Sequence, residues 1–254
     1  MIQPSRGRAR IGILVPFTNT NLEPDMALMR PHGVSLHAAR LGGYDADEIP
    51  DETQMQALGA SALDEPLRLL AGVRPDVVLY GCTSATLTHG VAFDRALADQ
   101  IRAMGKAETV TAAGALVHAL TTLGARRVAF ASPYVPAIND MAIDFLETSG
   151  FAVVGRADVT GTLDNDGQGA MPPDAVYALG RRADVPEADV VVMSCTDMQS
   201  VSVLQSLEDA IGKPVISSNQ AMMFQTLQIL GINDPVPGFG SLLTRSRITS
   251  EQVA

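Results

Sequence analysis

The chain contains two cysteines, Cys82 and Cys195, and they stand in matching contexts. Residues 76–83 and residues 189–196 both follow the pattern Asp-Val-Val-x-x-x-Cys-Thr, and the two cysteines are 113 residues apart. A cysteine thiolate is a strong nucleophile and a thiol can carry a proton, so the two groups facing each other would form a catalytic pair. Lowering the pKa of a thiol from about 8.5 to about 7 makes half of the population nucleophilic at neutral pH.

Two other interpretations of the cysteines stay open at this point. Each could be a small buried apolar side chain at the end of a strand, without any chemistry. The pair could also be a transient redox couple, although the sequence lacks a Cys-x-x-Cys motif. The matched contexts favour the catalytic pair over both alternatives.

A second internal repeat lies upstream of each cysteine. Residues 10–17 read Arg-Ile-Gly-Ile-Leu-Val-Pro-Phe, and residues 127–134 read Arg-Val-Ala-Phe-Ala-Ser-Pro-Tyr, 117 residues later. Because both repeats have nearly the same offset, a duplicated unit is favoured over a chance match. We therefore expect two pseudo-symmetric lobes, with a boundary near residue 112.

Short apolar runs alternate with longer amphipathic stretches, which predicts an α/β fold with a doubly wound parallel sheet flanked by helices in each lobe. The expected strands span residues 10–15, 34–39, 76–80, 109–112, 127–131, 151–157, 190–193 and 214–216. The expected helices span residues 92–104, 113–123, 138–148, 174–182, 200–211 and 220–230. Since ligands bind outside the carboxyl ends of parallel strands, we expect the active site in the cleft between the lobes.

Polar groups that follow the strands complete the candidate site. Backbone N–H groups after each cysteine could bind an anion or stabilise a thiolate. A single residue of this kind is more often a helix cap or a turn residue, so the argument rests on the shared position at strand ends. The residues concerned are Thr83, Ser84, Thr196 and Asp197 after the cysteines, and Thr18, Asn19, Asn21, Tyr134, Asn165 and Ser217–Asn219 elsewhere.

Composition narrows the possible partners. The 254 residues are 46% hydrophobic, enough for a substantial core, and the net charge of −10 disfavours nucleic acid and anionic membrane as partners. The sequence has neither a signal peptide nor an apolar run of membrane-spanning length, so we expect a cytoplasmic protein with reduced thiols. Dinucleotide, P-loop, calcium and zinc motifs are missing, and we expect no cofactor and no metal.

At these residues the sequence resembles the aspartate/glutamate racemase superfamily, and most closely its maleate cis–trans isomerase branch. The matching stretches follow the family's order over most of the chain. They are Ile-Gly-Ile-Leu-Val-Pro-Phe-Thr-Asn-Thr at 11–20, Tyr-Gly-Cys-Thr-Ser at 80–84, Ala-Ser-Pro-Tyr at 131–134, Asp-Asn at 164–165, Ser-Cys-Thr at 194–196 and Ser-Ser-Asn-Gln at 217–220.

The resemblance implies a cofactor-free, two-lobed and homo-oligomeric isomerase of a small unsaturated dicarboxylate, converting maleate to fumarate. It implies that Cys82 is the nucleophile and Cys195 its proton-transfer partner, and that Asn19, Tyr134 and Asn165 hold the substrate carboxylates. From their place after the cysteines, we expect Thr83, Ser84 and Thr196 to bind the substrate as well. It also implies that residues 221–254 return to the first lobe, residues 1–112, while residues 113–220 form the second.

One departure from the family pattern concerns the residues after Pro16. Isomerases of this branch commonly have small residues there, whereas this chain has Phe17 and Thr18, so Phe17 is expected to reshape the pocket. The related arylmalonate decarboxylases keep only the second-lobe cysteine, and the presence of both argues against that activity. Two alternatives stay open, namely an amino-acid or hydroxy-acid racemase or epimerase that uses the cysteines as an acid/base pair, and a non-catalytic binder of small acids.

Overall fold

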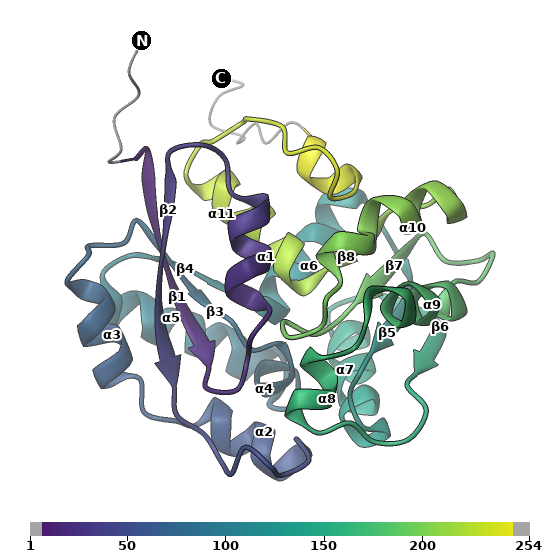
Figure 1. The fold of residues 1–254 in the computed structure, drawn as a ribbon, viewed down its shortest axis with the longest axis horizontal. Coiled ribbons are helices and arrows are strands. Elements are labelled where there is room, and N and C mark those ends of the chain that lie inside the picture. Colours follow the sequence, from purple (N-terminus) through teal and green to yellow (C-terminus); the bar gives the residue numbers. More distant parts are fainter. Residues whose placement is uncertain (1–6, 246–254) are drawn as a thin grey trace.

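The computed structural model describes residues 7–245 and contains two parallel four-stranded sheets (Figure 1). The first sheet has the order β2-β1-β3-β4, and the second has the equivalent order β6-β5-β7-β8. The strands of the first are β1 (Ala9–Pro16), β2 (Val34–Leu41), β3 (Val77–Tyr80) and β4 (Glu108–Thr111). Those of the second are β5 (Arg127–Ser132), β6 (Ala152–Asp158), β7 (Val190–Met193) and β8 (Val215–Ser217). The predicted α/β fold with two similar halves is confirmed.

Helices flank both sheets, as expected for parallel strands that are buried on two faces (Figure 1). They are α1 (Leu22–Met29), α2 (Glu52–Gly59), α3 (Asp64–Ala71), α4 (Thr83–Leu87), α5 (Gly90–Gly105), α6 (Ala112–Leu123), α7 (Pro136–Thr148), α8 (Asn165–Gly169), α9 (Pro173–Ala183), α10 (Leu204–Ile211) and α11 (Ser218–Ile229), with 3₁₀ turns η1 (Val201–Val203) and η2 (Ser241–Thr244). The expected helix over 200–211 is divided into η1 and α10. The expected helices include none of α1, α2, α3, α4 and α8, which have eight residues or fewer and are too short for a clear helical period.

The internal repeats correspond to equal contacts at the start of each sheet. The backbone N–H of Arg10 donates to the Asp76 carboxylate at 2.8 Å, and the N–H of Arg127 donates to the Asp189 carboxylate at the same distance. In return, the N–H of each aspartate donates to the carbonyl of the arginine, again at 2.8 Å in both lobes. The repeated aspartate therefore fixes the register between the first and third strand of each sheet, β1 with β3 and β5 with β7.

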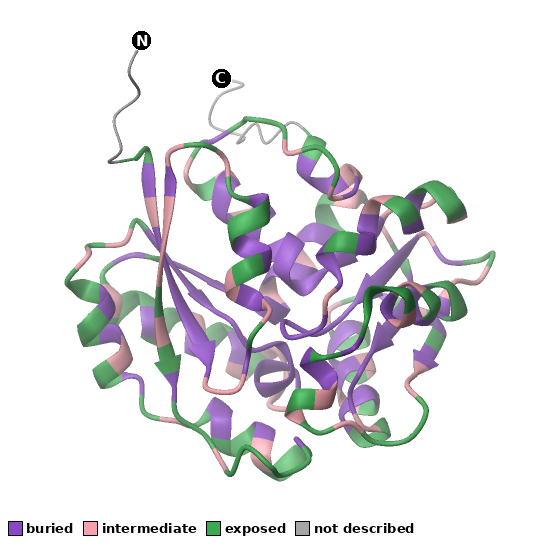
Figure 2. Cartoon of the chain, viewed as in Figure 1, coloured by how far each residue is buried: buried purple, intermediate pink, exposed green. Residues whose placement is uncertain are grey.

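The core runs through both sheets, and the inner strands are buried along their length (Figure 2). Helix α11 packs against α6 and also contacts α1 and the strands β4 and β8. Because β4 belongs to the first sheet and β8 to the second, α11 contacts both sheets. The first seven residues of α11 are all completely buried. The predicted lobe limits stay a prediction, and residues 246–254 of the predicted returning segment lie outside the described part of the chain.

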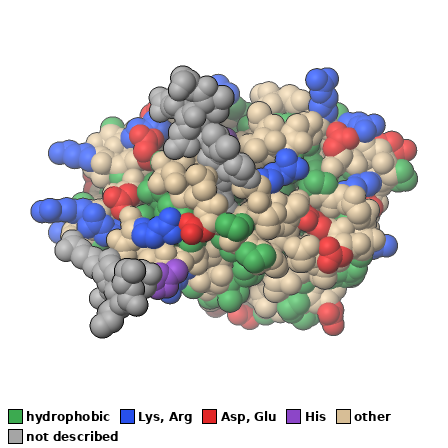
Figure 3. All heavy atoms as spheres, turned by 90° about the horizontal axis from the view of Figure 1, so that it is seen from above, with side chains coloured by type: hydrophobic (Ala, Val, Ile, Leu, Met, Phe, Trp, Pro, Cys, Tyr) green, Lys and Arg blue, Asp and Glu red, His purple; other side chains and the backbone are tan. Residues whose placement is uncertain are grey.

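Charges of both signs are interspersed on the face of the molecule where the two termini lie (Figure 3). An example is the ion pair between Arg8 and Asp234, with 2.7 Å between nitrogen and oxygen. Among residues 7–245, no helix is long and apolar enough to cross a membrane.

Candidate active site

Cys82 and Cys195 follow directly after the ends of β3 and β7, and both line one small cavity to which the two halves contribute. Its volume is about 40 Å³, room for little more than a water molecule. The lining residues are Pro16, Thr18, Asn19, Tyr44, Pro50, Met55, Leu58, Cys82, Ser84, Asn165, Gln168, Cys195, Thr196 and Asp197. A larger hollow between β2 and α3 contains no cysteine, so the chemistry belongs to the smaller cavity.

The sulfur of Cys82 lies among hydrogen-bond donors. Its side chain is 5% exposed, and burial raises the pKa of the thiol above its ordinary value. The backbone N–H groups of Ala85 and Ser84, at the start of α4, act in the opposite direction and lower the pKa. The Ser84 hydroxyl lies 3.6 Å from the sulfur. Cys82 therefore occupies a site in which several groups favour the thiolate against the effect of burial.

The sulfur of Cys195 has different neighbours. Burial raises the pKa of this thiol well above its usual value, and the negative charge of Asp197 raises the pKa further. The thiol donates to the side-chain oxygen of Gln168 at a sulfur–oxygen distance of 3.9 Å. Opposing these effects, the Asp197 N–H donates to the sulfur at 3.3 Å, and a hydrogen bond with Tyr134 also lowers the pKa. The balance keeps Cys195 in its thiol form at neutral pH.

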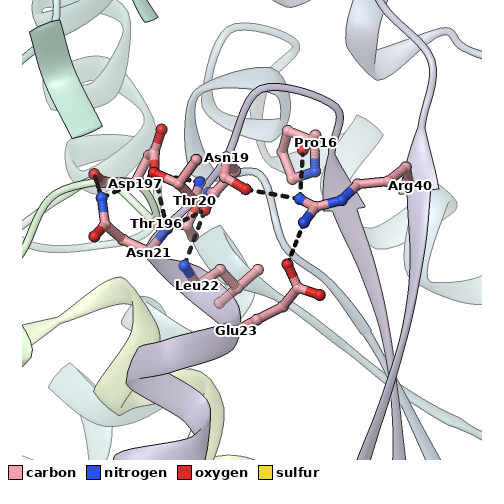
Figure 4. A network of polar contacts seen from close by, with 9 residues as sticks. All are labelled: Pro16, Asn19, Thr20, Asn21, Leu22, Glu23, Arg40, Thr196 and Asp197. Atoms are coloured by element: carbon pink, nitrogen blue, oxygen red, sulfur yellow. Dashed lines mark hydrogen bonds and ion pairs between the residues drawn. The ribbon is translucent and has the colours of Figure 1, made fainter. Parts of the chain in front are cut away.

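Asn19 joins the two halves beside the cysteines (Figure 4). Its amide nitrogen donates to the Thr196 hydroxyl at 2.9 Å, and that hydroxyl donates to the carbonyl of Gly81 at 2.8 Å. The Asn19 side-chain oxygen accepts from the backbone N–H groups of Asn21 and Leu22 at the start of α1. An amide nitrogen carries two hydrogens, so one remains for a bound ligand.

Asn165 also lines the cavity, and its amide is bonded to the segment before α2. Its oxygen accepts from the Tyr44 hydroxyl at 2.8 Å, and its nitrogen donates to the carbonyls of Ala46 and Glu48 at 3.1 and 3.2 Å. The Thr18 hydroxyl reaches the same oxygen at 3.4 Å. To bind a substrate carboxylate, Asn165 must release the segment around residues 44–48.

Thr83 and Tyr134 are not among the residues that line the cavity, although both are buried next to the cysteines. The Thr83 hydroxyl donates to the Ser218 hydroxyl at 2.9 Å. Tyr134 hydrogen-bonds with Thr83 and with Cys195, and burial raises the pKa of its phenol well above the ordinary value. Tyr134 is thus a neutral phenol that hydrogen-bonds with one residue from each of the two cysteine turns.

Phe17 affects the pocket through Tyr44. The two rings meet edge to face, with their centroids 5.3 Å apart and their planes at 89°. A side chain at Gly43 would collide with the Phe17 ring, since a Cβ there would lie 2.1 Å from it. The glycine lets Phe17 approach, and Phe17 in turn supports the tyrosine whose hydroxyl bonds Asn165.

Sequence reasoning missed three functional side chains at this site. Gln168 and Tyr44 have no signal in the sequence, because each acts through a contact between segments far apart in the chain. Asp197 was considered only for its backbone N–H, while its carboxylate accepts from the backbone N–H groups of Thr20 and Asn21 at 2.8 and 3.0 Å. Its position next to Thr196 in the repeated Cys-Thr motif could have pointed to it. Within residues 7–245, no group of three or more metal-binding side chains is placed to hold an ion.

Comparisons with known proteins agree with this geometry. The model of the arylmalonate decarboxylase family matches residues 11–243. A maleate isomerase from Nocardia farcinica is 31% identical over 247 residues, covering 93% of this chain and 96% of the relative.

Two solved structures are similar over the same range. The maleate isomerase Iso from Pseudomonas putida S16 has a TM-score of 0.85 at 25% identity, covering 93% of this chain and 98% of that one. A cysteine-to-serine mutant of the Nocardia farcinica maleate cis–trans isomerase, with a covalently bound succinylcysteine intermediate, has a TM-score of 0.85 at 27% identity and the same coverage.

Proposed function

The chain belongs to the arylmalonate decarboxylase family, in which it is similar to maleate isomerases, and from this premise we propose that it isomerises maleate to fumarate by covalent catalysis. The observation that carries the proposal is that Cys82 and Cys195 line one small cavity, with groups that favour a thiolate at the first and a thiol at the second.

Cys82 is the proposed nucleophile. Rotation about a carbon–carbon double bond is blocked until that bond becomes single, and addition of a thiolate makes it so. The Cys82 sulfur bonds to one alkene carbon, and the electron pair of the double bond moves onto the neighbouring carbon and its carboxylate. The N–H groups of Ser84 and Ala85 favour the reactive form of the sulfur before the attack. The succinylcysteine seen in the Nocardia farcinica enzyme supports an adduct of this kind.

Cys195 is the proposed proton donor. It transfers its proton to the neighbouring carbon, which completes a succinyl adduct on Cys82 and leaves Cys195 as a thiolate. After rotation about the new single bond, the Cys195 thiolate removes a proton from the same carbon, the double bond re-forms and the carbon–sulfur bond breaks. Gln168 and Tyr134, which hydrogen-bond with Cys195, orient the sulfur throughout.

Neutral donors are proposed to hold the substrate carboxylates. The Asn19 amide nitrogen has a second hydrogen beyond its bond to Thr196, and Asn19, Ser84 and Thr196 all line the cavity. Asn165 joins them once the segment bearing Tyr44 opens. Thr83 and Tyr134 do not line the cavity. We propose that their hydrogen bonds position the two cysteine turns and that neither residue contacts a carboxylate directly.

Proton NMR of the purified protein with maleate tests the proposal. Fumarate is expected to appear with the wild-type protein and not with Cys82→Ala, and mass spectrometry of the quenched wild-type protein is expected to find one added maleic acid on Cys82. Turnover without any covalent adduct would contradict nucleophilic addition. If maleate gives no fumarate, and an amino or hydroxy acid incubated in deuterated buffer exchanges the proton at its chiral carbon for deuterium, the racemase would replace the isomerase.

The proposal includes a homo-oligomer in the cytoplasm, with lobes of residues 1–112 and 113–220 and a return of the chain to the first lobe after residue 220. Both cysteines are free, and the proposed chemistry needs them reduced, which supports a reducing compartment.

A further inference from the structure

The two cysteine turns share the sequence Cys-Thr and differ at the next residue, which is Ser84 in the first half and Asp197 in the second. We propose that Asp197 is the positioning residue that makes Cys195 the proton-carrying member of the pair and leaves Cys82 as the nucleophile. The proposal rests on the function proposed above and adds the residue that assigns the two roles.

The Asp197 carboxylate is fixed in place by the opposite half of the molecule (Figure 4). One oxygen accepts from the backbone N–H groups of Thr20 and Asn21 at 2.8 and 3.0 Å, and from the Asn21 side chain at 3.0 Å. The Asn21 side chain also donates to the Asp197 carbonyl at 2.7 Å. Burial raises the pKa of this carboxyl, which is 8% exposed, and the donors from Thr20 and Asn21 act in the opposite direction and favour the charged form. The hydrogen bonds also give its negative charge a fixed position in the cleft.

The effect of this charge differs between the two sulfurs. After burial, Asp197 contributes most to the raised pKa of Cys195, two residues away. At Cys82 its contribution is smaller than those of the Ala85 N–H and the Ser84 hydroxyl, which lower the pKa. A carboxylate next to one thiol and a hydroxyl next to the other therefore separate two groups that occupy equivalent places in the repeated fold.

The other titratable groups around Asp197 leave this asymmetry in place. Asp25 on α1 is a second buried carboxyl, and burial raises its pKa to about 7, which disfavours a negative charge there. Tyr134 is a neutral phenol that hydrogen-bonds with Cys195. The cation of this network is Arg40, which donates to the Asn19 carbonyl at 2.7 Å and pairs with Glu23 on the other side of the loop from Asp197 (Figure 4).

Carbon-13 NMR of protein labelled at the cysteine Cβ measures both thiols directly. Because the chain has two cysteines, the spectrum has two cysteine signals, and Cys82→Ser assigns them. In Asp197→Asn, which keeps an oxygen for the Thr20 and Asn21 N–H groups, Cys195 is expected to begin titrating at a pH about one unit lower than in the wild type, a tenfold change in its acid dissociation constant, and Cys82 is expected to shift less.

Asp25→Asn is the matched control, since it removes a buried carboxyl from the same network, and it is expected to leave the separation between the two cysteines unchanged. An identical pH response of Cys195 in the wild type and Asp197→Asn would overturn the proposal. Equal shifts at both cysteines would also overturn it, because they would indicate a loosened cleft. The titration needs no substrate, so its outcome is independent of whether maleate is turned over.

Ser84→Asp tests the same idea without altering the contacts of Asp197. A carboxylate beside Cys82 is expected to raise the pH at which Cys82 titrates by about one unit, towards the behaviour of Cys195. No rise at Cys82 in a folded Ser84→Asp protein would overturn the proposal.

Discussion

The two halves of the molecule have the same strand order and the same arginine–aspartate contact at the start of the sheet, yet they surround their cysteines differently. After Cys82 the chain turns at once into α4, whose first N–H groups favour a thiolate. After Cys195 the chain runs through an irregular segment to η1, the thiol donates to the Gln168 oxygen, and the charge of Asp197 raises the pKa of the thiol.

The difference shows that a repeated fold fixes where two side chains lie, while the residues next to them fix what each can do. Position comes from the strand ends, which bring Cys82 and Cys195 to one cavity. Reactivity comes from the local donors, acceptors and charges, which shift the pKa of each thiol by separate causes.

Removing the nucleophile gives the largest expected effect. Cys82→Ala is expected to lower the rate of maleate isomerisation by about 10⁴-fold or more, because the other sulfur in the cavity, that of Cys195, stays in its thiol form and cannot replace the nucleophile. Fumarate formation followed by NMR measures the rate, and an unchanged thermal unfolding curve serves as the control for folding. A Cys82→Ala protein that retains a tenth of the activity would contradict the assignment of the nucleophile to the first half.

Replacing the second cysteine tests the complementary role. Cys195→Ser is expected to lower kcat by about 10²- to 10⁴-fold, the usual contribution of a positioned general acid or base, while addition to Cys82 still occurs. The covalent adduct on Cys82 is therefore expected to accumulate, which mass spectrometry of the quenched protein measures. If the Cys195→Ser protein forms no adduct on Cys82, Cys195 is also needed for the attack of Cys82 on the double bond.

Two buried carboxyls, those of Asp197 and Asp25, lie near the junction of the halves, and they accept different numbers of hydrogen bonds. The Asp197 carboxylate has several donors, whereas the Asp25 carboxylate accepts from the Asn219 amide at 2.7 Å, and burial raises its pKa to about 7. The folded protein thus holds a proton on Asp25 that the unfolded chain releases near pH 4, and this contribution to stability is lost as the pH rises towards 7.

Asp25→Asn is accordingly expected to stabilise the protein at pH 8 by up to about 4 kcal/mol, and by little at pH 4, where the folded wild-type protein holds the proton and the unfolded chain still holds it about half of the time. Thermal unfolding at the two pH values measures the difference, with several degrees expected at pH 8. Equal effects at pH 4 and pH 8 would show that Asp25 is already ionised in the folded state.

The smallest expected effect concerns the segment that covers the cavity. Tyr44→Phe removes the 2.8 Å hydrogen bond to Asn165, worth about 1 kcal/mol, and is expected to change KM for maleate several-fold while kcat stays within a factor of a few. Steady-state kinetics measure both constants. Tyr177→Phe, on the surface helix α9, is the matched control and is expected to change neither.

The sequence predicted those parts of the structure that depend on repeated local patterns. The eight strands and the longer helices follow from apolar runs, and the placement of both cysteines follows from the rule that ligands bind at the carboxyl ends of parallel strands. The contacts of Asn165 with Tyr44 and of Asp197 with Thr20 could not be predicted in this way, because residues more than 100 positions apart form them and no periodicity records such pairings.

The small volume of the cavity also has a consequence for the chemical survival of the enzyme. Thiols are lost in cells through oxidation and through reaction with electrophiles, and their susceptibility follows thiolate character and exposure. Cys82 and Cys195 are each 5% exposed, and they share their small cavity with Tyr44 and Asn165, which bond to each other, so peroxides and foreign electrophiles have little access to either sulfur. An occupied site excludes these reagents, and a supply of substrate thereby prolongs the working life of the catalyst.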